Sequence, residues 1–205
     1  SVLADPLSIP TLLALLSKPQ SEVKRLAAWA LCRVKPVTNP KVVEELQKLV
    51  TNENESIAVR VNAVRALGSI AFDNPQLKIW QTLVTTIQMR GDKYSMLRYY
   101  AVRSLGELGT TNPEVAQTLV RIAVRDPDPE LRKEAVYALR SLPSASDEAL
   151  AELSSSFIGA GEDELRVRII EALADLGSAD ATGLAGELVR GTMAVPLKRR
   201  VMQAV

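Results

Sequence analysis

The sequence has no histidine and only one cysteine, Cys32. Histidine is the side chain most often used as a general base and a frequent metal ligand, so its absence excludes the commonest catalytic and metal sites. A single cysteine cannot form a disulfide within the chain, and no pair of cysteines has the spacing of a zinc site. We therefore expect a chain without catalytic residues, metal or cofactor.

Aromatic residues are also scarce, at 4% of the 205 residues, although 47% are hydrophobic. The core must therefore be aliphatic. No hydrophobic run approaches the roughly 20 residues that span a bilayer, and neither a phosphate-binding glycine loop nor a nucleophile elbow is present. The absence of a signal peptide predicts a cytoplasmic protein, unless a leader before Ser1 has been removed.

The net charge of the whole chain indicates neither a basic nor an acidic protein, because 25 lysines and arginines and 24 acids give a net charge of +1. The two halves differ, however. Residues 1–110 hold 14 bases and nine acids, whereas residues 111–205 hold 11 bases and 15 acids. Two interpretations stay open: a chance fluctuation, or a positive N-terminal half that attracts an acidic partner.

One pattern recurs along the chain. An aliphatic residue is followed by a basic residue, then by alanine or an aliphatic residue at the fourth position, a small residue at the seventh and an aliphatic residue, usually leucine, at the eighth. These positions share one face of a helix with 3.6 residues per turn. Its six copies start 36, 38, 34, 34 and 32 residues apart, at Val23, Val59, Leu97, Leu131, Leu165 and Leu197.

A second set of amphipathic helices lies between these copies. Asn39-Pro40, Asn74-Pro75 and Asn112-Pro113 are typical of helix starts, and Gly68, Gly109 and Gly177 are typical of helix ends. The pattern predicts an all-α fold, a right-handed α-α superhelix of about six helix pairs in a single domain, 1–205. The predicted second-set helices are 10–17, 40–51, 75–89, 113–124, 147–158 and 180–190, and the repeats run over roughly 5–35, 39–71, 74–109, 112–142, 145–177 and 179–205.

The segments from Val59 to Gly68 and from Leu97 to Gly106 resemble HEAT repeats. They are similar in particular to the short bacterial HEAT-like repeats of phycobilisome lyases. The resemblance covers nearly the whole chain. It implies a stack of helix pairs whose second helices line a concave surface, and it leaves the function open, because one fold serves many functions.

The basic residues at the second position of each copy form a column, Lys24, Arg60, Arg98, Arg132, Arg166 and Lys198. The resemblance implies a structural ladder in which these cations pair with acids such as Asp92, Asp128 and Asp163. The alternative interpretation is a row of phosphate contacts along a groove.

Other positions of the second helices are expected to point away from the stack, and they carry aromatic residues beside arginines. Tryptophan, tyrosine and arginine are the usual anchors of interfaces. The alternative is that the rings pack against the next repeat. The candidate partner-binding residues are Trp29, Arg33, Arg65, Tyr99, Tyr100, Arg103 and Tyr137.

Three functions follow from these observations. The first is a non-catalytic scaffold or adaptor that binds a protein or peptide on the concave surface. The second, implied by the resemblance, is a lyase-like subunit that binds a bilin and a phycobiliprotein. The third is nucleic-acid binding by the basic N-terminal half, which a net charge near zero disfavours.

Overall fold

The structure is a computed structural model that describes residues 8–34, 37, 39–70, 78–109, 111–191 and 193–205. Within these ranges it contains twelve α-helices, one short 3₁₀ helix and no strand, which confirms the predicted all-α class. The helices are α1 (Ile9–Leu16), α2 (Ser21–Leu31), α3 (Pro40–Thr51), α4 (Ile57–Ile70), α5 (Ile79–Ile87), η5 (Asp92–Tyr94), α6 (Ser95–Glu107), α7 (Pro113–Arg125), α8 (Pro129–Arg140), α9 (Asp147–Ser156), α10 (Asp163–Asp175), α11 (Asp180–Arg190) and α12 (Val195–Ala204).

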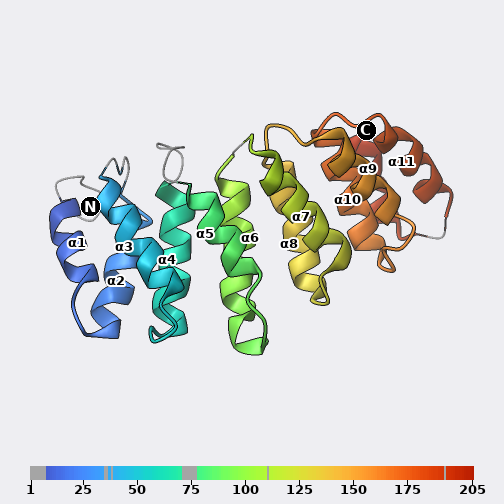
Figure 1. Ribbon diagram of the computed structural model, residues 1–205. Coiled ribbons are helices and arrows are strands. Elements are labelled where there is room, and N and C mark those ends of the chain that lie inside the picture. Colours follow the sequence, from blue (N-terminus) through green and yellow to red (C-terminus); the bar gives the residue numbers. More distant parts are fainter. Residues whose placement is uncertain (1–7, 35–36, 38, 71–77, 110, 192) are drawn as a thin grey trace. The chain divides into compact units, whose positions relative to one another are not determined.

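The chain divides into two compact units, Ser1–Leu108 and Gly109–Val205. In unit 1, α1 packs on α2, α3 on α4 and α5 on α6, and the second helices α2, α4 and α6 also pack against one another in order (Figure 1). In unit 2, the pairs are α7 with α8, α9 with α10 and α11 with α12, and α8, α10 and α12 pack in order. Each unit is therefore a short stack of helix pairs, as the repeat predicts.

Asparagine and aspartate side chains start several of these helices. Asn39 accepts a hydrogen bond from the Lys41 backbone N–H, Asn112 from that of Glu114 and Asp128 from that of Glu130, at 3.0, 2.9 and 2.9 Å. Each cap is followed by proline at the first helical position, where the missing N–H costs nothing. The predicted start at Asn74-Pro75 lies outside the described residues, and α5 begins only at Ile79.

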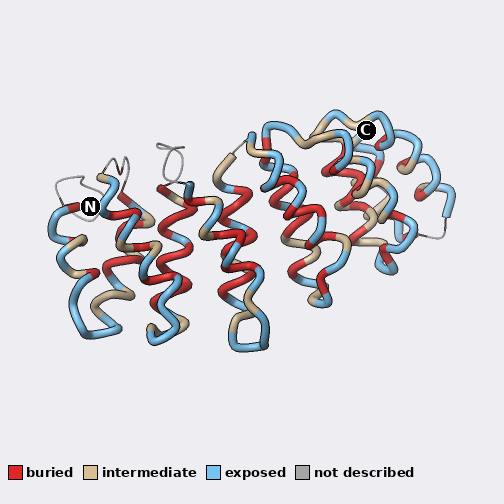
Figure 2. The backbone as a smooth tube through the Cα atoms, in the orientation of Figure 1, coloured by how far each residue is buried: buried red, intermediate tan, exposed pale blue. Residues whose placement is uncertain are grey.

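The aliphatic residues of the repeat form the core of each unit (Figure 2). Ala63, Leu67, Ala101 and Leu105 are fully buried between α4 and its neighbours. Since an isolated helix of this length is unstable in water, burial of this stripe against the next helix stabilises each pair. Among the described residues the core contains few rings: Phe157 is buried and Trp80 is half-buried.

Gly68 corrects one prediction about the turns. Gly109 and Gly177 have the positive φ expected after a helix, at 53° and 74°. Gly68, in contrast, lies inside α4 and faces α6. A Cβ atom at Gly68 would approach the Ser104 backbone Cα to 2.9 Å, which is closer than packed atoms come. This glycine therefore sets how closely α4 and α6 pack.

Candidate functional site

Six of the seven predicted partner-binding residues lie in unit 1, on or beside its second helices. Trp29 lies in α2 and Arg33 follows that helix, Arg65 lies in α4, and α6 carries Tyr99, Tyr100 and Arg103. Because α4 packs against both α2 and α6, these residues occupy three neighbouring helices. We call this surface the second-helix face of unit 1. Arg33, Arg65 and Arg103 are exposed, and the rings of Trp29, Tyr99 and Tyr100 are half-buried.

Two of the arginines stack on aromatic rings. The Arg33 guanidinium carbon lies 4.9 Å from the centre of the Trp29 ring, and that of Arg65 lies 5.2 Å from the centre of the Tyr100 ring. Tyr99 meets Tyr100 edge to face, with ring centres 5.6 Å apart. Attraction between a cation and a ring face orients each guanidinium and leaves its N–H edge available to a further acceptor. In the part of the chain that the structure describes, neither Arg33 nor Arg65 forms an ion pair.

A hollow of about 250 Å³ opens beside the Arg65–Tyr100 stack. Inside it, Arg103 donates to Glu107 at 3.3 Å, Ser69 donates to the Cys32 carbonyl at 2.8 Å and Ser104 donates to the Val64 carbonyl at 3.3 Å. The two hydroxyls are therefore engaged in holding the helices together. The lining residues are Cys32, Arg65, Ser69, Tyr100, Arg103, Ser104 and Glu107.

Cys32 also lines this hollow. Burial raises the pKa of its thiol to about 11, although the nearby charge of Arg65 opposes the shift. Its Sγ atom lies 3.4 Å from the Ala28 carbonyl and faces the Asn62 carbonyl at 3.9 Å. Since a thiol with such a pKa stays protonated near neutral pH, Cys32 acts as a small packing residue between α2 and α4.

The basic column is a structural ladder, but most of its acceptors are not the expected acids. Arg60 and Arg98 donate from Nε to the carbonyls of Val50 and Ile87, both at 2.9 Å. Arg132 and Lys198 donate to the carbonyls of Asp126 and Gly191, at 3.0 and 2.9 Å. Each of these carbonyls lies at or near the C-terminal end of the preceding helix, where carbonyl groups lack helical partners and a cation is favoured by the helix dipole.

Carboxylate partners hold the two remaining members of the column. Lys24 pairs with Glu55, and Arg166 pairs with Asp163 at 3.3 Å. The expected acid Asp128 caps α8 instead. Arg60 is only 1% exposed, and its guanidinium lies against the Tyr94 ring. Arg60 and Arg98 are buried and bonded to carbonyls, which makes these two side chains unavailable to phosphates.

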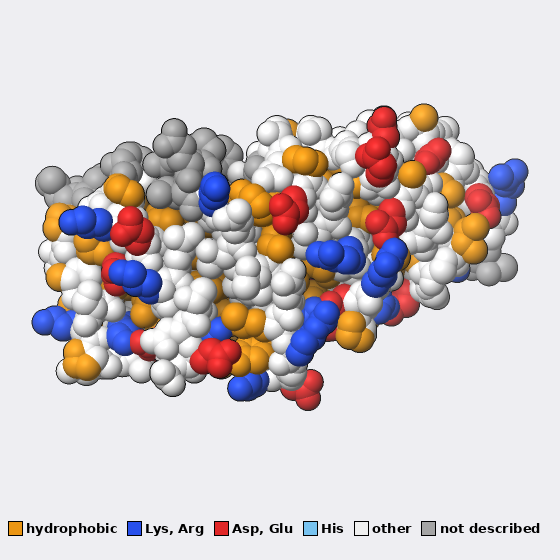
Figure 3. Space-filling view, viewed as in Figure 1, with side chains coloured by type: hydrophobic (Ala, Val, Ile, Leu, Met, Phe, Trp, Pro, Cys, Tyr) orange, Lys and Arg blue, Asp and Glu red, His pale blue; other side chains and the backbone are white. Residues whose placement is uncertain are grey.

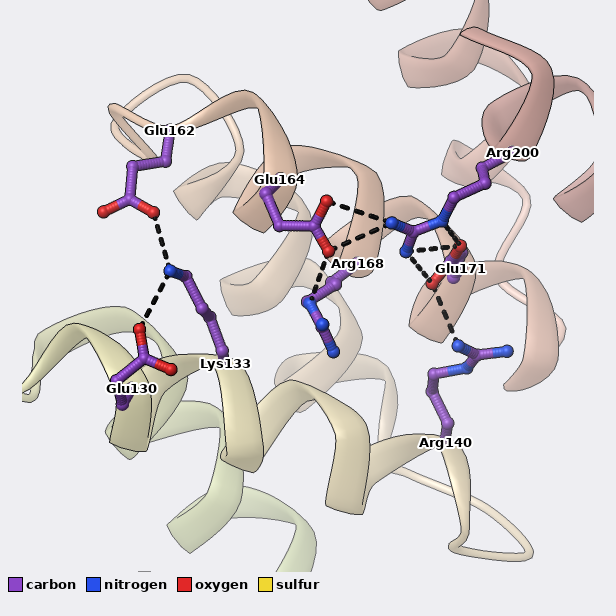
Figure 4. Close-up of polar contacts among 8 residues, drawn as sticks. All are labelled: Glu130, Lys133, Arg140, Glu162, Glu164, Arg168, Glu171 and Arg200. Atoms are coloured by element: carbon purple, nitrogen blue, oxygen red, sulfur yellow. Dashed lines mark hydrogen bonds and ion pairs between the residues drawn. The ribbon is translucent and has the colours of Figure 1, made fainter. Parts of the chain in front are cut away.

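The seventh predicted residue, Tyr137, lies in α8 of unit 2 and is 51% exposed. Two of the positions of unit 2 that correspond to Arg65 and Arg33 carry acids, Glu171 and Asp175. Arg140 contacts Glu171 at 2.9 Å and Asp175 at 2.6 Å, and Arg200 contacts Glu164 at 3.0 Å and Glu171 at 2.9 Å (Figure 4). These residues, with Arg168 on Glu164, form what we call the unit 2 ion-pair network.

The network also shifts the titration of its members. Partial burial alone would raise the pKa of Glu164, but hydrogen bonds and charge from Arg200 and Arg168 outweigh that effect and hold the pKa below its usual range. The pKa of Arg200 is raised by Glu164 and Glu171 against the opposing effect of burial. The repeat pattern alone does not predict this pairing, because it depends on contacts between α8, α10 and α12.

Two classes of feature are not found among the described residues. No group of three or more potential metal-ligating side chains occurs in those ranges. Within the same ranges, no helix is both long and apolar enough to cross a bilayer.

The face of the molecule in Figure 3 carries acids and bases interspersed with apolar side chains.

Comparison with known proteins identifies the repeat. The profile of HEAT repeats matches residues 9–79 and 83–174, and no curated protein matches the chain. Among solved structures, an engineered protein is 21% identical with a TM-score of 0.66, over 96% of this chain and 94% of that chain. A designed armadillo repeat protein in complex with the peptide (KR)4 is 19% identical with a TM-score of 0.63, over 95% and 97% of the two chains.

A third similar structure is described as a computationally designed armadillo repeat protein for modular peptide recognition. It is 18% identical with a TM-score of 0.60, over 95% of this chain and 97% of that chain. At such identities these structures establish the fold alone. The narrower likeness to phycobilisome lyases is not confirmed by these matches. Because the HEAT profile covers most of the sequence in two long segments, the chain belongs to the HEAT-repeat family.

Proposed function

We propose that this chain is a non-catalytic scaffold that binds a protein segment or peptide on the second-helix face of unit 1. The observation that carries the proposal is the pair of stacked arginines, Arg33 on Trp29 and Arg65 on Tyr100, exposed on neighbouring repeats. Tyr99 and Arg103 extend the same face, and Tyr137 is a separate exposed anchor on unit 2.

This arrangement has the composition of an interface hot spot. Arginine, tyrosine and tryptophan supply most of the binding free energy at protein interfaces, since they combine large apolar area with directed hydrogen bonds. Rings that are half-buried lose little conformational freedom on binding, because their neighbours already hold them. The hollow beside Arg65 gives a partner side chain a place to enter.

The similar designed armadillo proteins support a peptide as one form of partner. One of them is described in complex with (KR)4, a peptide of lysine and arginine. The second-helix face of unit 1 instead presents arginines, so it is unsuited to a basic peptide. The fold similarity therefore supports peptide binding in general, and the charge of this face argues for a different peptide.

The other two functions have less support. A lyase-like role has less support from the one thiol of the chain, because Cys32 is half-buried and its pKa is raised to about 11. Nucleic-acid binding would need a basic row along the stack, but the basic column is partly buried and bonded to carbonyls.

The proposal is tested by affinity capture from a lysate of the source cells. The bait is compared with an Arg65→Glu/Arg103→Glu variant, and with Lys41→Glu/Arg90→Glu as a control that makes the same charge change at two exposed residues away from this face. Circular dichroism establishes that each variant is folded. We expect specific proteins to be lost with the first variant and kept with the control. Recovery of the same proteins with all three baits would contradict the proposal.

A further inference from the structure

We infer that the partner of this face is an extended acidic peptide with a carboxylate at about every third residue. The inference rests on the proposed function and adds the chemistry and spacing of the bound segment. Its basis is the sign and the orientation of Arg33 and Arg65, together with the usual spacing of packed helices.

The first step concerns sign. The second-helix face of unit 1 holds Arg33, Arg65 and Arg103, and the acid that lines the hollow beside Arg65 is Glu107. Glu107 already contacts Arg103 at 3.3 Å, so the inference rests on Arg33 and Arg65. Neither forms an ion pair within the described ranges, and a carboxylate is the acceptor best matched to the planar edge of a guanidinium.

The second step concerns orientation. Each of these two guanidiniums lies against a ring, at 4.9 and 5.2 Å from its centre. A guanidinium held by its face keeps its N–H groups directed sideways, so both donors can meet the two oxygens of one carboxylate. A lysine ammonium could not reproduce this arrangement, because it has no planar edge.

The third step concerns separation. Neighbouring packed helices lie about 8–10 Å apart. An extended polyproline-type peptide rises about 3.1 Å per residue and returns to the same side every third residue, after about 9 Å. A peptide that crosses α2 and α4 can therefore bring one carboxylate to each of these two helices when acids recur at every third position.

The probe is a fluorescein-labelled peptide with four repeats of aspartate-proline-proline, titrated with the full chain and followed by fluorescence anisotropy. Three further peptides are compared: lysine in place of aspartate, serine in place of aspartate, and the same composition with its four aspartates in one block. A single-stranded oligothymidylate of equal charge reports on nucleic-acid binding. Salt is raised from about 20 to 150 mM to follow the electrostatic contribution.

The matched variants are Arg33→Gln/Arg65→Gln and, as a control, Lys41→Gln/Arg90→Gln, which loses the same two charges outside the face. Circular dichroism confirms folding, and a double-glutamine variant that fails to fold is replaced by Arg65→Lys, which keeps the charge and removes the planar edge.

We expect the spaced aspartate peptide to bind, the lysine and serine peptides to bind at least about tenfold more weakly, and the double-glutamine variant to lose about tenfold or more in affinity. The control variant should change the affinity by less than about twofold. The blocked aspartate peptide should bind several-fold more weakly than the spaced one.

Several results would overturn the inference. No binding of the spaced peptide, an equal loss in both variants, or tighter binding of the lysine peptide or the oligothymidylate would each contradict an acidic peptide partner. Equal binding of spaced and blocked peptides would contradict the spacing. If the peptides fail but capture from lysate still depends on Arg65 and Arg103, the scaffold proposal stands and only the acidic partner is wrong.

Discussion

Units 1 and 2 both carry arginines on or beside their second helices, but those arginines have different neighbours. In unit 1, Arg33 and Arg65 lie on aromatic rings. In unit 2, Arg140 and Arg200 lie between carboxylates, and Glu171 bridges the two. The same side chain therefore serves recognition in one unit under our proposal and internal cohesion in the other.

The difference has a simple origin in sequence. At the sixth position after the start of the pattern, α2 and α4 carry Trp29 and Arg65, whereas α10 carries Glu171. An acid at this place lies between arginines of the preceding and following second helices, and it satisfies both. Aromatic residues cannot neutralise an arginine, so they orient it and leave its charge available to a partner.

The largest difference in stability that we expect is between a glycine substitution in unit 1 and one in unit 2. Gly68→Ala should destabilise the protein by about 1–3 kcal/mol, because the new Cβ overlaps the Ser104 backbone and forces α4 away from α6. Gly183→Ala in α11 is the control, since a Cβ there meets open space. It should be neutral or stabilise by up to about 1 kcal/mol through helix propensity. Urea unfolding followed by circular dichroism measures both, and equal destabilisation would contradict the close approach.

The next effect concerns the centre of the unit 2 ion-pair network. Glu171→Ala should cost about 1–3 kcal/mol, since it leaves Arg140 and Arg200 without their shared partner. Both arginines keep about a third of their side-chain surface exposed, so water limits the loss. The same measurement applies, with Glu187→Ala on exposed α11 as the control. A Glu171→Ala protein as stable as the control would mean that the network contributes nothing.

A smaller effect compares the two kinds of arginine directly. Arg200→Ala should cost about 1 kcal/mol, because Glu164 and Glu171 each lose one of their two arginine partners. Arg65→Ala should change stability by less than about 0.5 kcal/mol, because only a stacking contact is lost at an exposed site. Urea midpoints of the two variants decide the matter. A larger loss for Arg65→Ala would show that the stacked arginines are structural after all.

The smallest effect is a pH dependence of unit 2. The pKa of Glu164 is lower in the folded protein than in the unfolded chain, so its contribution is present above about pH 4.3 and is lost as the pH falls through the folded value. The Glu164→Gln variant should therefore be less stable than the parent at pH 7, and the difference should shrink as the pH approaches 3. A difference that is constant from pH 7 to 3 would contradict the depressed pKa.

The repeat made the fold predictable. Residues such as Ala63 and Leu67 recur at the helical period, and burial of such a stripe dictates a stack of helix pairs whatever the function. The helix caps could also be predicted, since Asn39 and Asn112 bond to backbone N–H groups only two residues further along the chain. The start of α5 at Ile79 could not be predicted, because the residue before it, Lys78, adopts a left-handed conformation that lysine rarely adopts.

Contacts between helices were harder to predict than the helices themselves. The pattern placed Arg65 and Tyr100 on one face, but their stacking depends on the spacing of α4 and α6, which Gly68 sets from within the helix. Glycine is typical of helix ends, so the sequence predicts a helix end at Gly68. Its close packing against Ser104 of α6 depends on a neighbouring helix and cannot be predicted from local sequence. The acceptors of Arg60 and Arg98 could not be predicted, because they are backbone carbonyls, which every residue has and which no residue type identifies.

The central claim is that the sign of the charge on the second-helix face of unit 1 selects the partner, and a charge reversal tests it most directly. The Arg33→Glu/Arg65→Glu variant and the parent are each titrated with the spaced aspartate peptide and with its lysine counterpart at the same salt concentration. Our account predicts an inversion: the parent prefers the aspartate peptide, and the variant prefers the lysine peptide. An unchanged preference for the aspartate peptide in a folded variant would contradict it.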